Sequence, residues 1–256
     1  MERATGVEPA TSSLGSWHST TELHPLSCES RSQSASCQIS AEVPKLSARS
    51  FTSFTMNQST KLSREFYARP VLIVARECIG KVLVHRTVEG EGAGRIVEAE
   101  AYRGPQDLAA HSARGLTKRT TAMYGPPGHA YTYLLYGISW AINLVTTSEG
   151  APHAVLIRAI EPIRGLDLMA RRRKKSADSR ELTNGPGKLT QALAITSSEY
   201  AMDLCGSQLY LETCSIPVGR IGRSMRVNVD YAGPWASKQW RFYERGNRYI
   251  SVSPRD

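Results

Sequence analysis

The 256-residue sequence has no apolar run that approaches the ~18 residues of a membrane-spanning helix, so we expect no membrane partner. Cysteine is also scarce. The five cysteines are Cys28, Cys37, Cys78, Cys205 and Cys214. They contain no CxxC spacing, and an odd, scattered set argues against a disulfide framework and against a structural zinc site. These absences favour a protein of the reducing cytoplasm that binds no metal ion.

Acidic residues are the scarcer charged class. The chain has 32 Lys and Arg against 23 Asp and Glu, which gives a net charge of +9. A basic chain favours a polyanionic partner without proving one. The hydrophobic share of 41% and the charged share of 21% are those of a soluble globular protein, and the length allows one large domain or two small ones.

Residues 1–55 differ from the rest of the chain. They contain 19 Ser or Thr and no apolar periodicity, which predicts a disordered tail, and they show no signal-peptide pattern. The stretch ERATGVEPATSSLGSWHSTTELHPL resembles peptides that arise when a start codon is assigned too far upstream, across a transfer-RNA gene. We therefore expect the true start at Met56 and a folded domain over residues 56–256; a genuine regulatory tail is the alternative.

The stretch RIVEAEAYRGPQDLAAHS (residues 95–112) places two glutamates on a short apolar segment. Six of its residues alternate with a period of two, which predicts a β-strand. One face carries Val97, Ala99 and Ala101, and the other carries Glu98, Glu100 and Tyr102. Gly104 and Pro105 end the strand, and we expect Asp107 to cap a short helix that carries His111. The acidic face has two interpretations, a solvated surface or a site that needs a carboxylate.

The stretch AYTYLLYGISWAINLV (residues 130–145) has two β-rich arms around Tyr136 and Gly137, which predicts a β-hairpin. Tyr131 and Tyr133 lie on one face of its first arm. The sheet itself cannot bury a tyrosine at a hairpin tip. Three explanations for Tyr136 remain: a packed loop residue, an anchor for a partner protein, or a wedge that enters a base stack.

The remaining segments predict a mixed architecture. A helix-like start at LSREFYARP precedes strands from about Lys81 to Tyr102, and HAVLIRAIEP is a buried strand. The stretches PIRGLDLMARRRKK and TNGPGKLTQALAI contain helices, and further strands follow near the C-terminal end. Strands and helices do not alternate as regular βαβ units, so we expect a single α+β domain rather than a doubly wound fold.

The acidic strand and the hairpin explain each other if the partner is a nucleic acid. A nucleotide that Tyr136 displaces from a duplex could stack between tyrosines, and chemistry would then occur at the base or at the sugar carbon C1′. A carboxylate on the neighbouring strand can take a proton from water that attacks C1′ and can stabilise an oxocarbenium-like transition state. One glutamate would then belong to a site rather than to a solvated face.

Five blocks of the sequence share a resemblance to one protein family: EAEAYRGPQDLAAHS, YTYLLYGISWAINLV, VLIRAIEP, NGPGKLTQAL and RFYERGN. Together they resemble the alkyladenine (3-methylpurine) DNA glycosylase family, as found in bacteria. The resemblance extends from about Leu62 to Val252. The resemblance implies a monofunctional DNA repair hydrolase. It would flip alkylated or deaminated purines out of double-stranded DNA and cut the N-glycosidic bond, leaving an abasic site. It also implies no metal or organic cofactor and a curved antiparallel sheet whose protruding hairpin enters the minor groove. We expect a monomer of the bacterial cytoplasm and nucleoid.

The resemblance assigns roles to single residues. Glu100, directly before Ala-Tyr, matches the general base, whereas Glu98 does not match it. Arg158 matches the arginine that helps to hold the catalytic water. The remaining matches are Tyr102 and Tyr133 as stacking walls of the pocket, His111 as the residue that hydrogen-bonds the flipped base, Asn143 as the asparagine that checks the purine 2-position, and Tyr136 as the intercalating tyrosine.

Three further features carry weaker signals. The spacing in GPGKL is not that of a Walker motif, so Lys188 contacts a DNA phosphate at a helix N-terminus or lies in a plain helix-entry loop. The basic run from Arg171 to Lys175 is expected to be solvated and to attract DNA non-specifically. Asn228 stands where the family usually has glycine. Asparagine tolerates a positive φ, so we expect the bend to be kept, while the backbone carbonyl that helps to position the water is put in question.

Two other functions remain open from the sequence. One is a module that bends or flips DNA without chemistry, although a carboxylate beside a phosphate backbone weakens binding. The other is a carbohydrate-active hydrolase with Glu98 and Glu100 as its acid pair, although the positive charge argues against a neutral sugar substrate. The sequence does not indicate which damaged base is preferred.

Overall fold

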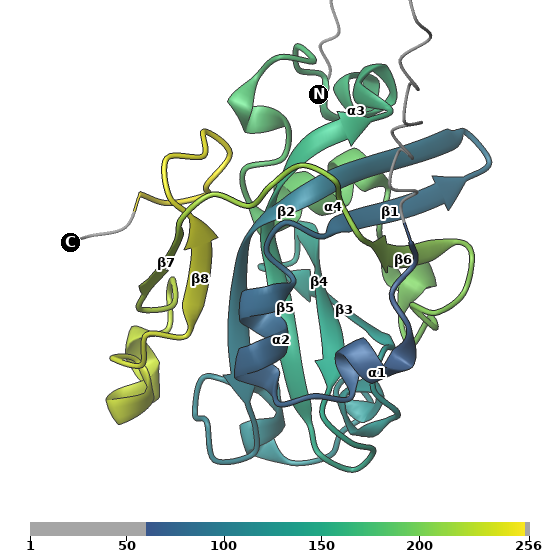
Figure 1. Ribbon diagram of the computed structural model, residues 1–256. Helices are drawn as coiled ribbons and strands as arrows, with labels where there is room; N and C mark the ends of the chain where they lie inside the picture. The colour runs from purple at the N-terminus through teal and green to yellow at the C-terminus, as the bar shows by residue number, and fades with distance from the viewer. Residues whose placement is uncertain (1–59, 254–256) are drawn as a thin grey trace, which may run out of the picture. The chain divides into compact units, whose positions relative to one another are not determined.

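The computed structural model describes residues 60–253, so the tail predicted for residues 1–55 lies outside the described residues. The described chain is built around one open antiparallel sheet (Figure 1), in which the strands follow the order β3-β4-β5-β2-β1-β6. At its branch, β8 pairs with β2 and β7 pairs with β8. The strands are Val82–Thr87 (β1), Gly90–Arg103 (β2), Ala130–Leu135 (β3), Ser139–Thr146 (β4), His153–Arg164 (β5), Leu209–Glu212 (β6), Ile221–Ser224 (β7) and Arg241–Glu244 (β8).

Short helices complete a mixed α+β domain, as the sequence predicts. The α-helices of the described residues are Arg64–Tyr67 (α1), Val71–Glu77 (α2), Leu166–Arg173 (α3) and Pro186–Leu193 (α4). The 3₁₀ turns are His111–Arg114 (η1), Thr121–Tyr124 (η2), Arg180–Leu182 (η3), Ser197–Glu199 (η4) and Asp230–Trp235 (η5). α2 packs against β2 and β5, and α4 packs against β4 and β5 (Figure 1). Both helices therefore cover the strands that carry the candidate site.

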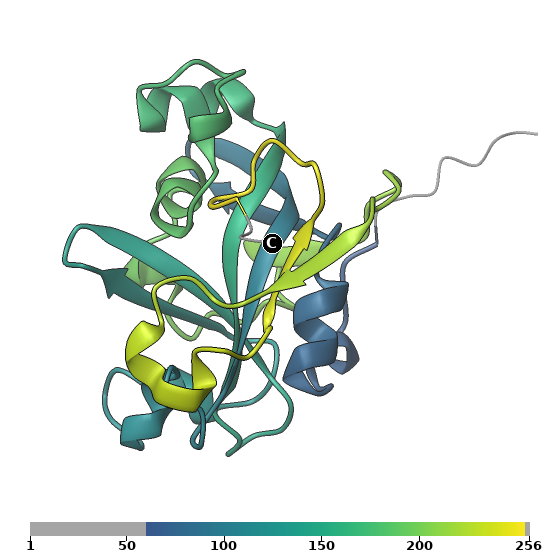
Figure 2. The same ribbon diagram turned by 90° about the vertical axis from the view of Figure 1, so that its left-hand side faces the viewer.

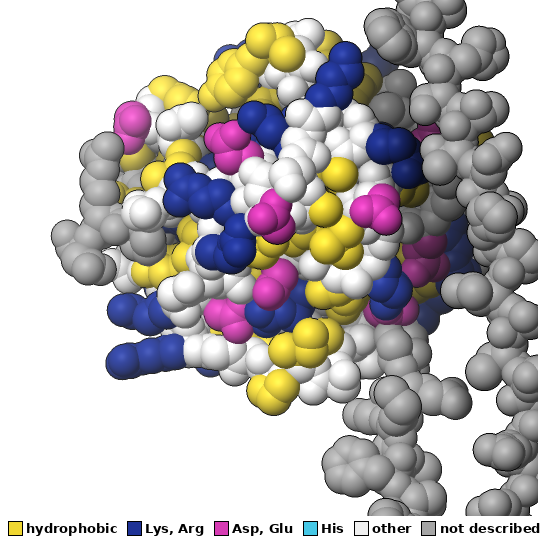
Figure 3. Space-filling view, turned by 90° about the horizontal axis from the view of Figure 1, so that it is seen from above, with side chains coloured by type: hydrophobic (Ala, Val, Ile, Leu, Met, Phe, Trp, Pro, Cys, Tyr) yellow, Lys and Arg dark blue, Asp and Glu magenta, His cyan; other side chains and the backbone are white. Residues whose placement is uncertain are grey.

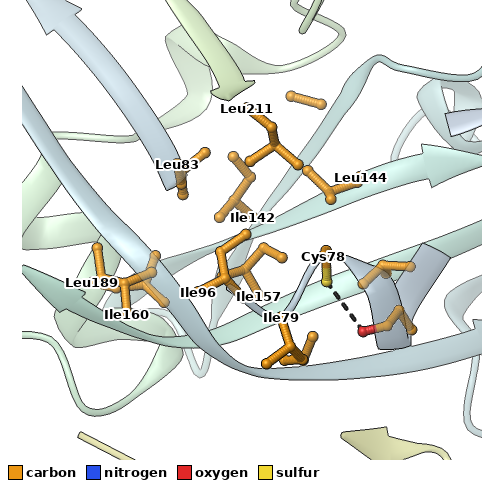
Figure 4. Close-up of a cluster of buried hydrophobic side chains, with 14 of the residues drawn as sticks. Cys78, Ile79, Leu83, Ile96, Ile142, Leu144, Ile157, Ile160, Leu189 and Leu211 are labelled. Atoms are coloured by element: carbon orange, nitrogen blue, oxygen red, sulfur yellow. Dashed lines mark hydrogen bonds between the residues drawn. The ribbon is translucent and has the colours of Figure 1, made fainter. Parts of the chain in front are cut away.

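The main core lies between these helices and the sheet. Ile96, Ile142 and Ile157, from three neighbouring strands, are fully buried together with Leu189 of α4 (Figure 4). Burying a side chain of this size contributes roughly 1.5–3 kcal/mol. The Sγ of Cys78 donates to the carbonyl of Ala75 at 3.2 Å in the same cluster, and burial raises the pKa of this thiol. Cys78 is thus a packing residue.

β2 is the longest strand, and its two halves have different neighbours. Residues 90–95 pair with β1, whereas residues 98–100 pair with β8, and β5 runs along the opposite edge. The register to β5 shifts on either side of Glu98, so the strict alternation predicted from the sequence is wrong at Val97. Val97 packs with Ala159 and Tyr249, while Ala99 lies in the main core. An extra residue in a strand rotates its neighbours, which is the usual effect of a β-bulge.

β3 and β4 form the predicted hairpin, and Leu135 pairs with Ser139 at its end. Tyr136 and Gly137 occupy the turn with φ of 51° and 72°. Positive φ at two consecutive turn residues matches the twist of a hairpin, and glycine adopts it without strain. β3 is an edge strand of the sheet, and Figure 2 shows the hairpin from the side.

The basic run at the end of α3 is less solvated than the sequence suggests. The guanidinium of Arg172 donates to Glu89, to the carbonyl of Ala192 and to Thr87. Lys175 pairs with Glu181 at 3.0 Å. Lys and Arg side chains are interspersed with Asp and Glu on the face seen from above, toward the end where α3 lies (Figure 3). The expectation of a fully solvated run is therefore wrong for Arg172, because its guanidinium closes the contact between α3, β1 and α4.

Candidate active site

Glu100 lies in the second half of β2 and is fully buried. Its Oε2 accepts from Tyr102 Oη at 2.8 Å and from Arg158 Nη1 at 3.3 Å, and its Oε1 accepts from the backbone N–H of Val227 at 2.8 Å. A buried carboxylate requires such partners. The interpretation of the acidic strand as a solvated face is therefore wrong.

Glu98 is equally buried but is engaged differently. Its Oε1 accepts from Arg158 Nε at 2.9 Å, from Arg241 Nε at 2.7 Å and from Ser251 Oγ at 2.8 Å, and its Oε2 accepts from Ser251 N–H at 2.6 Å. Three donors on one oxygen leave no position there for a further molecule. Glu98 thus acts as a structural acceptor for two guanidinium groups.

Arg158 lies in β5 where the register to β2 shifts, and it joins the two glutamates. It is 7% exposed, and its Nη2 also donates to Ser251 Oγ at 3.2 Å. Burial acts to lower the pKa of Arg158, but the Glu100 and Glu98 carboxylates outweigh this effect and raise it above its ordinary value. Arg158 is therefore a fixed cation beside Glu100.

A pocket of about 650 Å³ opens beside this group. The predicted site residues that line it are Tyr102, His111, Tyr133, Tyr136, Asn143 and Arg158. Glu100 does not line the pocket itself; it is connected to it through Tyr102 and Arg158, which both bond its Oε2. The structure thus brings together seven of the eight residues predicted from the sequence.

Tyr102 and Tyr133 supply aromatic surface to the pocket. Burial, together with the nearby Glu100 carboxylate, raises the pKa of Tyr102 well above its ordinary value. Burial likewise raises the pKa of Tyr133, and Tyr131 adds to this effect. Both phenols therefore stay protonated at neutral pH, and the Tyr102 hydroxyl remains a donor to Glu100.

His111 is the first residue of η1 and is partly buried. Its Nδ1 lies 2.8 Å from Tyr131 Oη in hydrogen-bond contact, and its ring meets that of Tyr133 edge-on with 4.5 Å between the ring centroids. Burial, with the guanidinium groups of Arg119 and Arg114, lowers the pKa of His111 to about 4. The imidazole is thus neutral at physiological pH.

Asp107 does not cap the helix that carries His111, contrary to the sequence-based expectation. η1 begins at His111 after Ala110, and the Asp107 side chain instead accepts from the backbone N–H groups of Arg103 and Ala109 at 3.1 Å each. It is fully buried and pairs with Arg226. A buried cation 119 residues away in the sequence is therefore a stronger partner than the helix terminus.

Asn143 comes from β4 and is 4% exposed. Its Nδ2 donates to the carbonyl of Tyr131 at 3.0 Å, which fixes the amide at the wall of the pocket. The resemblance to the family assigns no role to Tyr131. It is 1% exposed, supports both His111 and Asn143, and was detectable only as the partner of Tyr133 in the alternating pattern.

Tyr136 is 75% exposed at the hairpin tip, which excludes a packed loop residue. It lines the mouth of the pocket and also a second cavity of about 310 Å³, which contains Lys188 and Arg173. Lys188 Nζ donates to Asn184 Oδ1 at 2.9 Å and lies 3.6 Å from Glu181 Oε1. Lys188 is therefore outside the main pocket but beside the same hairpin.

Asn228 adopts φ of 58°, so the bend expected at this position is kept without glycine. Val227, Asn228 and Val229 line the pocket on the side of η5. The N–H of Val227 is the backbone donor to Glu100, a role that no sequence pattern indicates. Asparagine is among the few residues with a side chain that tolerate this conformation.

A buried carboxylate beside an aromatic-lined pocket is an arrangement suited to hydrolysis next to a bound planar ring. Residues 65–248 match the family model described as Methylpurine-DNA glycosylase (MPG). The chain belongs to the methylpurine-DNA glycosylase family.

Curated relatives agree with this family. A protein from Anaeromyxobacter sp. (strain Fw109-5) is 49% identical over 195 residues, which cover 76% of this chain and 94% of the relative. A Clostridium acetobutylicum protein is 46% identical over 204 residues, covering 77% and 100% of the two chains. A Methanocella arvoryzae protein is 47% identical over 191 residues, covering 74% and 95%. All three are named "Putative 3-methyladenine DNA glycosylase".

Residues 60–253 contain neither a candidate membrane span nor a candidate metal cluster. No helix within this range is long and apolar enough to cross a membrane. No group of three or more His, Cys, Asp or Glu residues in it is arranged to hold a metal ion.

Proposed function

We propose that this DNA glycosylase flips alkylated or deaminated purines out of double-stranded DNA and hydrolyses the N-glycosidic bond with Glu100 as the general base. The observation that carries the proposal is the position of Glu100. Its carboxylate is buried beside a pocket of about 650 Å³ and is held by Arg158, Tyr102 and the N–H of Val227.

The two oxygens of Glu100 differ in a way that suits this role. Oε2 has two side-chain donors, whereas Oε1 has one donor, the N–H of Val227. A carboxylate oxygen has two lone-pair positions, so Oε1 has room to accept from water. The water oxygen would attack C1′, the base would leave with the electron pair of the glycosidic bond, and Glu100 would take the proton. General-base catalysis of this kind typically gives ~10²–10⁴-fold.

The pocket residues suit a flipped purine. Tyr102 and Tyr133 offer aromatic faces, and stacking a base on such a face gives ~1–3 kcal/mol. The neutral His111 can hydrogen-bond the edge of the base without adding charge. Asn143 is fixed by Tyr131 and would test the purine 2-position.

The outer surface suits a duplex. The exposed Tyr136 would fill the gap left by the flipped nucleotide, because enzymes that extrude a base must offset the cost of unstacking. Lys188 would contact a backbone phosphate from its place beside the hairpin, and its contact with Glu181 is long enough to be exchanged. We infer a monomer that acts on DNA in the bacterial cytoplasm.

The direct test is release of a free base. A duplex with a single 3-methyladenine or hypoxanthine is incubated with the protein, and the released base and the abasic site are quantified. Release by the parent chain and its loss in Glu100→Gln support the proposal. Intact duplex after prolonged incubation with stoichiometric protein would refute it.

The competing two-carboxylate mechanism has little support from the geometry. A glycosidase acid pair needs both carboxyl groups to reach the substrate. Glu98 is held by four donors, and of its partners only Arg158 lines the pocket, whereas Glu100 also accepts from Tyr102 in the pocket wall.

A further inference from the structure

We propose that the buried ion pair of Asp107 and Arg226 positions the catalytic machinery, by fixing both the backbone donor to Glu100 and the Tyr102 wall. The inference rests on the proposed function of Glu100 and Tyr102. Neither Asp107 nor Arg226 lines the pocket, so both act through other residues.

Both members of the pair are buried and joined by two hydrogen bonds. Asp107 is 0% and Arg226 is 5% exposed. Arg226 Nη1 lies 2.5 Å from Asp107 Oδ2, and Nη2 lies 2.9 Å from Oδ1, which is a two-bond fork. Such a fork fixes the guanidinium in direction as well as in distance. The backbone N–H groups of Arg103 and Ala109 also donate to the Asp107 carboxylate, one to each oxygen.

Arg226 connects this fork to the general base. It directly precedes Val227, so the N–H that donates to Glu100 Oε1 belongs to the peptide group between the two residues. Arg226 Nη1 also donates at 3.0 Å to the carbonyl of Ala101, the residue between Glu100 and Tyr102. The guanidinium therefore holds the turn at residues 226–228 against β2 at the point where Glu100 lies.

The same guanidinium supports an aromatic wall. Its central carbon lies 4.7 Å from the ring centroid of Tyr102 and 5.2 Å from that of Trp240. Tyr102 lines the pocket and donates to Glu100. A shift of Arg226 would thus move Tyr102, and with it both the stacking surface of the pocket and a hydrogen-bond donor to Glu100.

Asp107 also contacts the loop that leads to His111. Asp107 Oδ1 accepts from Ala109 N–H in the loop that leads to His111 at the start of η1. One ion pair is therefore connected to the general base, to a wall and to the residue that faces the base edge. This convergence distinguishes it from an ordinary buried pair.

The chain offers a matched control in the pair of Arg95 and Glu244. These residues are 5% and 6% exposed, and Arg95 makes the same two-bond fork, with Nη1 at 3.1 Å and Nη2 at 2.7 Å from the two carboxylate oxygens. Arg95 also lies in β2, but neither member lines the pocket or contacts Glu100.

The test compares Arg226→Lys with Arg95→Lys, since lysine keeps the charge and cannot form the fork. Single-turnover base release, affinity for lesion DNA and melting temperature are measured on each variant, with release assayed well below every melting transition. A misplacement of the order of 1 Å costs up to about 100-fold in rate, so we expect Arg226→Lys to release base roughly 10- to 100-fold more slowly. Its affinity for lesion DNA should fall by a smaller factor than its rate of base release.

Arg95→Lys should lose comparable stability but keep the parent rate. The inference is overturned if Arg226→Lys releases base at the parent rate, or if Arg95→Lys slows release equally. If Arg226→Lys does not fold, the double variant Asp107→Asn with Arg226→Gln replaces it, because it leaves no unpaired buried charge; release at the parent rate by that variant also overturns the inference. A parent chain that releases no base would instead refute the proposed function.

Discussion

Glu98 and Glu100 lie two residues apart on β2 and share one guanidinium, that of Arg158, yet only Glu100 also accepts from the pocket residue Tyr102. The Nε of Arg158 donates to Glu98 and its Nη1 donates to Glu100 at the longer distance of 3.3 Å. Glu98 thereby anchors the arginine, and the arginine in turn faces the second carboxylate. The two acids are equally buried but have different hydrogen-bond partners.

The role of Glu100 as the general base is tested by substitution with glutamine. Glu100→Gln keeps the shape of the side chain but removes the proton acceptor and the negative charge near the sugar. We expect base release to fall by at least about 100-fold, in line with the loss of general-base catalysis. Affinity for lesion DNA should hold or increase, because a carboxylate that phosphates repel is gone. Single-turnover release and a binding titration check this, and release within a few-fold of the parent would contradict it.

A second prediction separates Glu98 from Glu100. Glu98→Gln leaves Arg158 and Arg241 facing a neutral group, and removing one partner of a buried pair costs about 3–5 kcal/mol of stability. We expect a clear fall in melting temperature with a smaller loss of release rate per folded molecule than in Glu100→Gln. Thermal unfolding and active-site titration provide the two values. If Glu98→Gln is inactive but as stable as the parent, Glu98 rather than Glu100 is the general base.

The hairpin tip is tested with Tyr136→Ser. Filling the gap in the stack matters only where a base must be extracted, and extrusion costs a few kcal/mol in paired DNA. Release from intact duplex should therefore suffer more than release from a mismatched or single-stranded site. The measurement is the rate of base release by the variant and by the parent from intact duplex, from a mismatched site and from single-stranded DNA. Equal losses on all of them would place Tyr136 in folding instead.

A pH prediction follows from His111, whose pKa burial lowers to about 4. The unfolded chain binds a proton at this residue near pH 6.5, whereas the folded chain does not until about pH 4. The contribution of neutral His111 to the free energy of unfolding is thus fully present above pH 6.5 and is lost as the pH falls toward 4. His111→Gln should weaken the decrease of melting temperature between pH 7 and 5. An unchanged pH dependence would show that His111 is not the group responsible.

The tail prediction remains untested by the described residues. A chain that begins at Met56 should match the full chain in melting temperature and in release rate, because residues 1–55 show no apolar periodicity to pack. Calorimetry and the release assay compare the two proteins directly. A large loss on truncation would indicate that the tail binds or packs.

Sequence reasoning worked where local pattern decides structure. The alternation from residue 97 to 102 located β2, the Tyr136-Gly137 break located the hairpin, and AVLI located β5. It did not predict α2, whose stretch VLIVARE is apolar in both helical and extended periods. It also missed the register shift at Glu98, because a bulge is set by the partner strand β5 and leaves no trace in the residues of β2.

In the candidate site, too, the local pattern predicts the strand but not the contacts between residues distant in the sequence. Glu98 and Glu100 are alike in pattern, and only the resemblance to a family separated them in the sequence. Their physical difference comes from donors far along the chain, such as Ser251 for Glu98 and Val227 for Glu100. The role of Asp107 was misread for the same reason: its partner Arg226 is 119 residues away. Contacts of that separation cannot be read from a single sequence.

The closure of Glu98 by Ser251 also has a consequence for biosynthesis. The two residues are 153 positions apart, and β8, which pairs beside Glu98, is likewise made late. A ribosome-bound chain that already contains β2, the hairpin and β5 would still hold Glu98 without its C-terminal donors and Glu100 without Val227. Catalytic competence should therefore appear only after Ser251 has left the exit tunnel, and shorter nascent fragments would create no abasic sites in DNA.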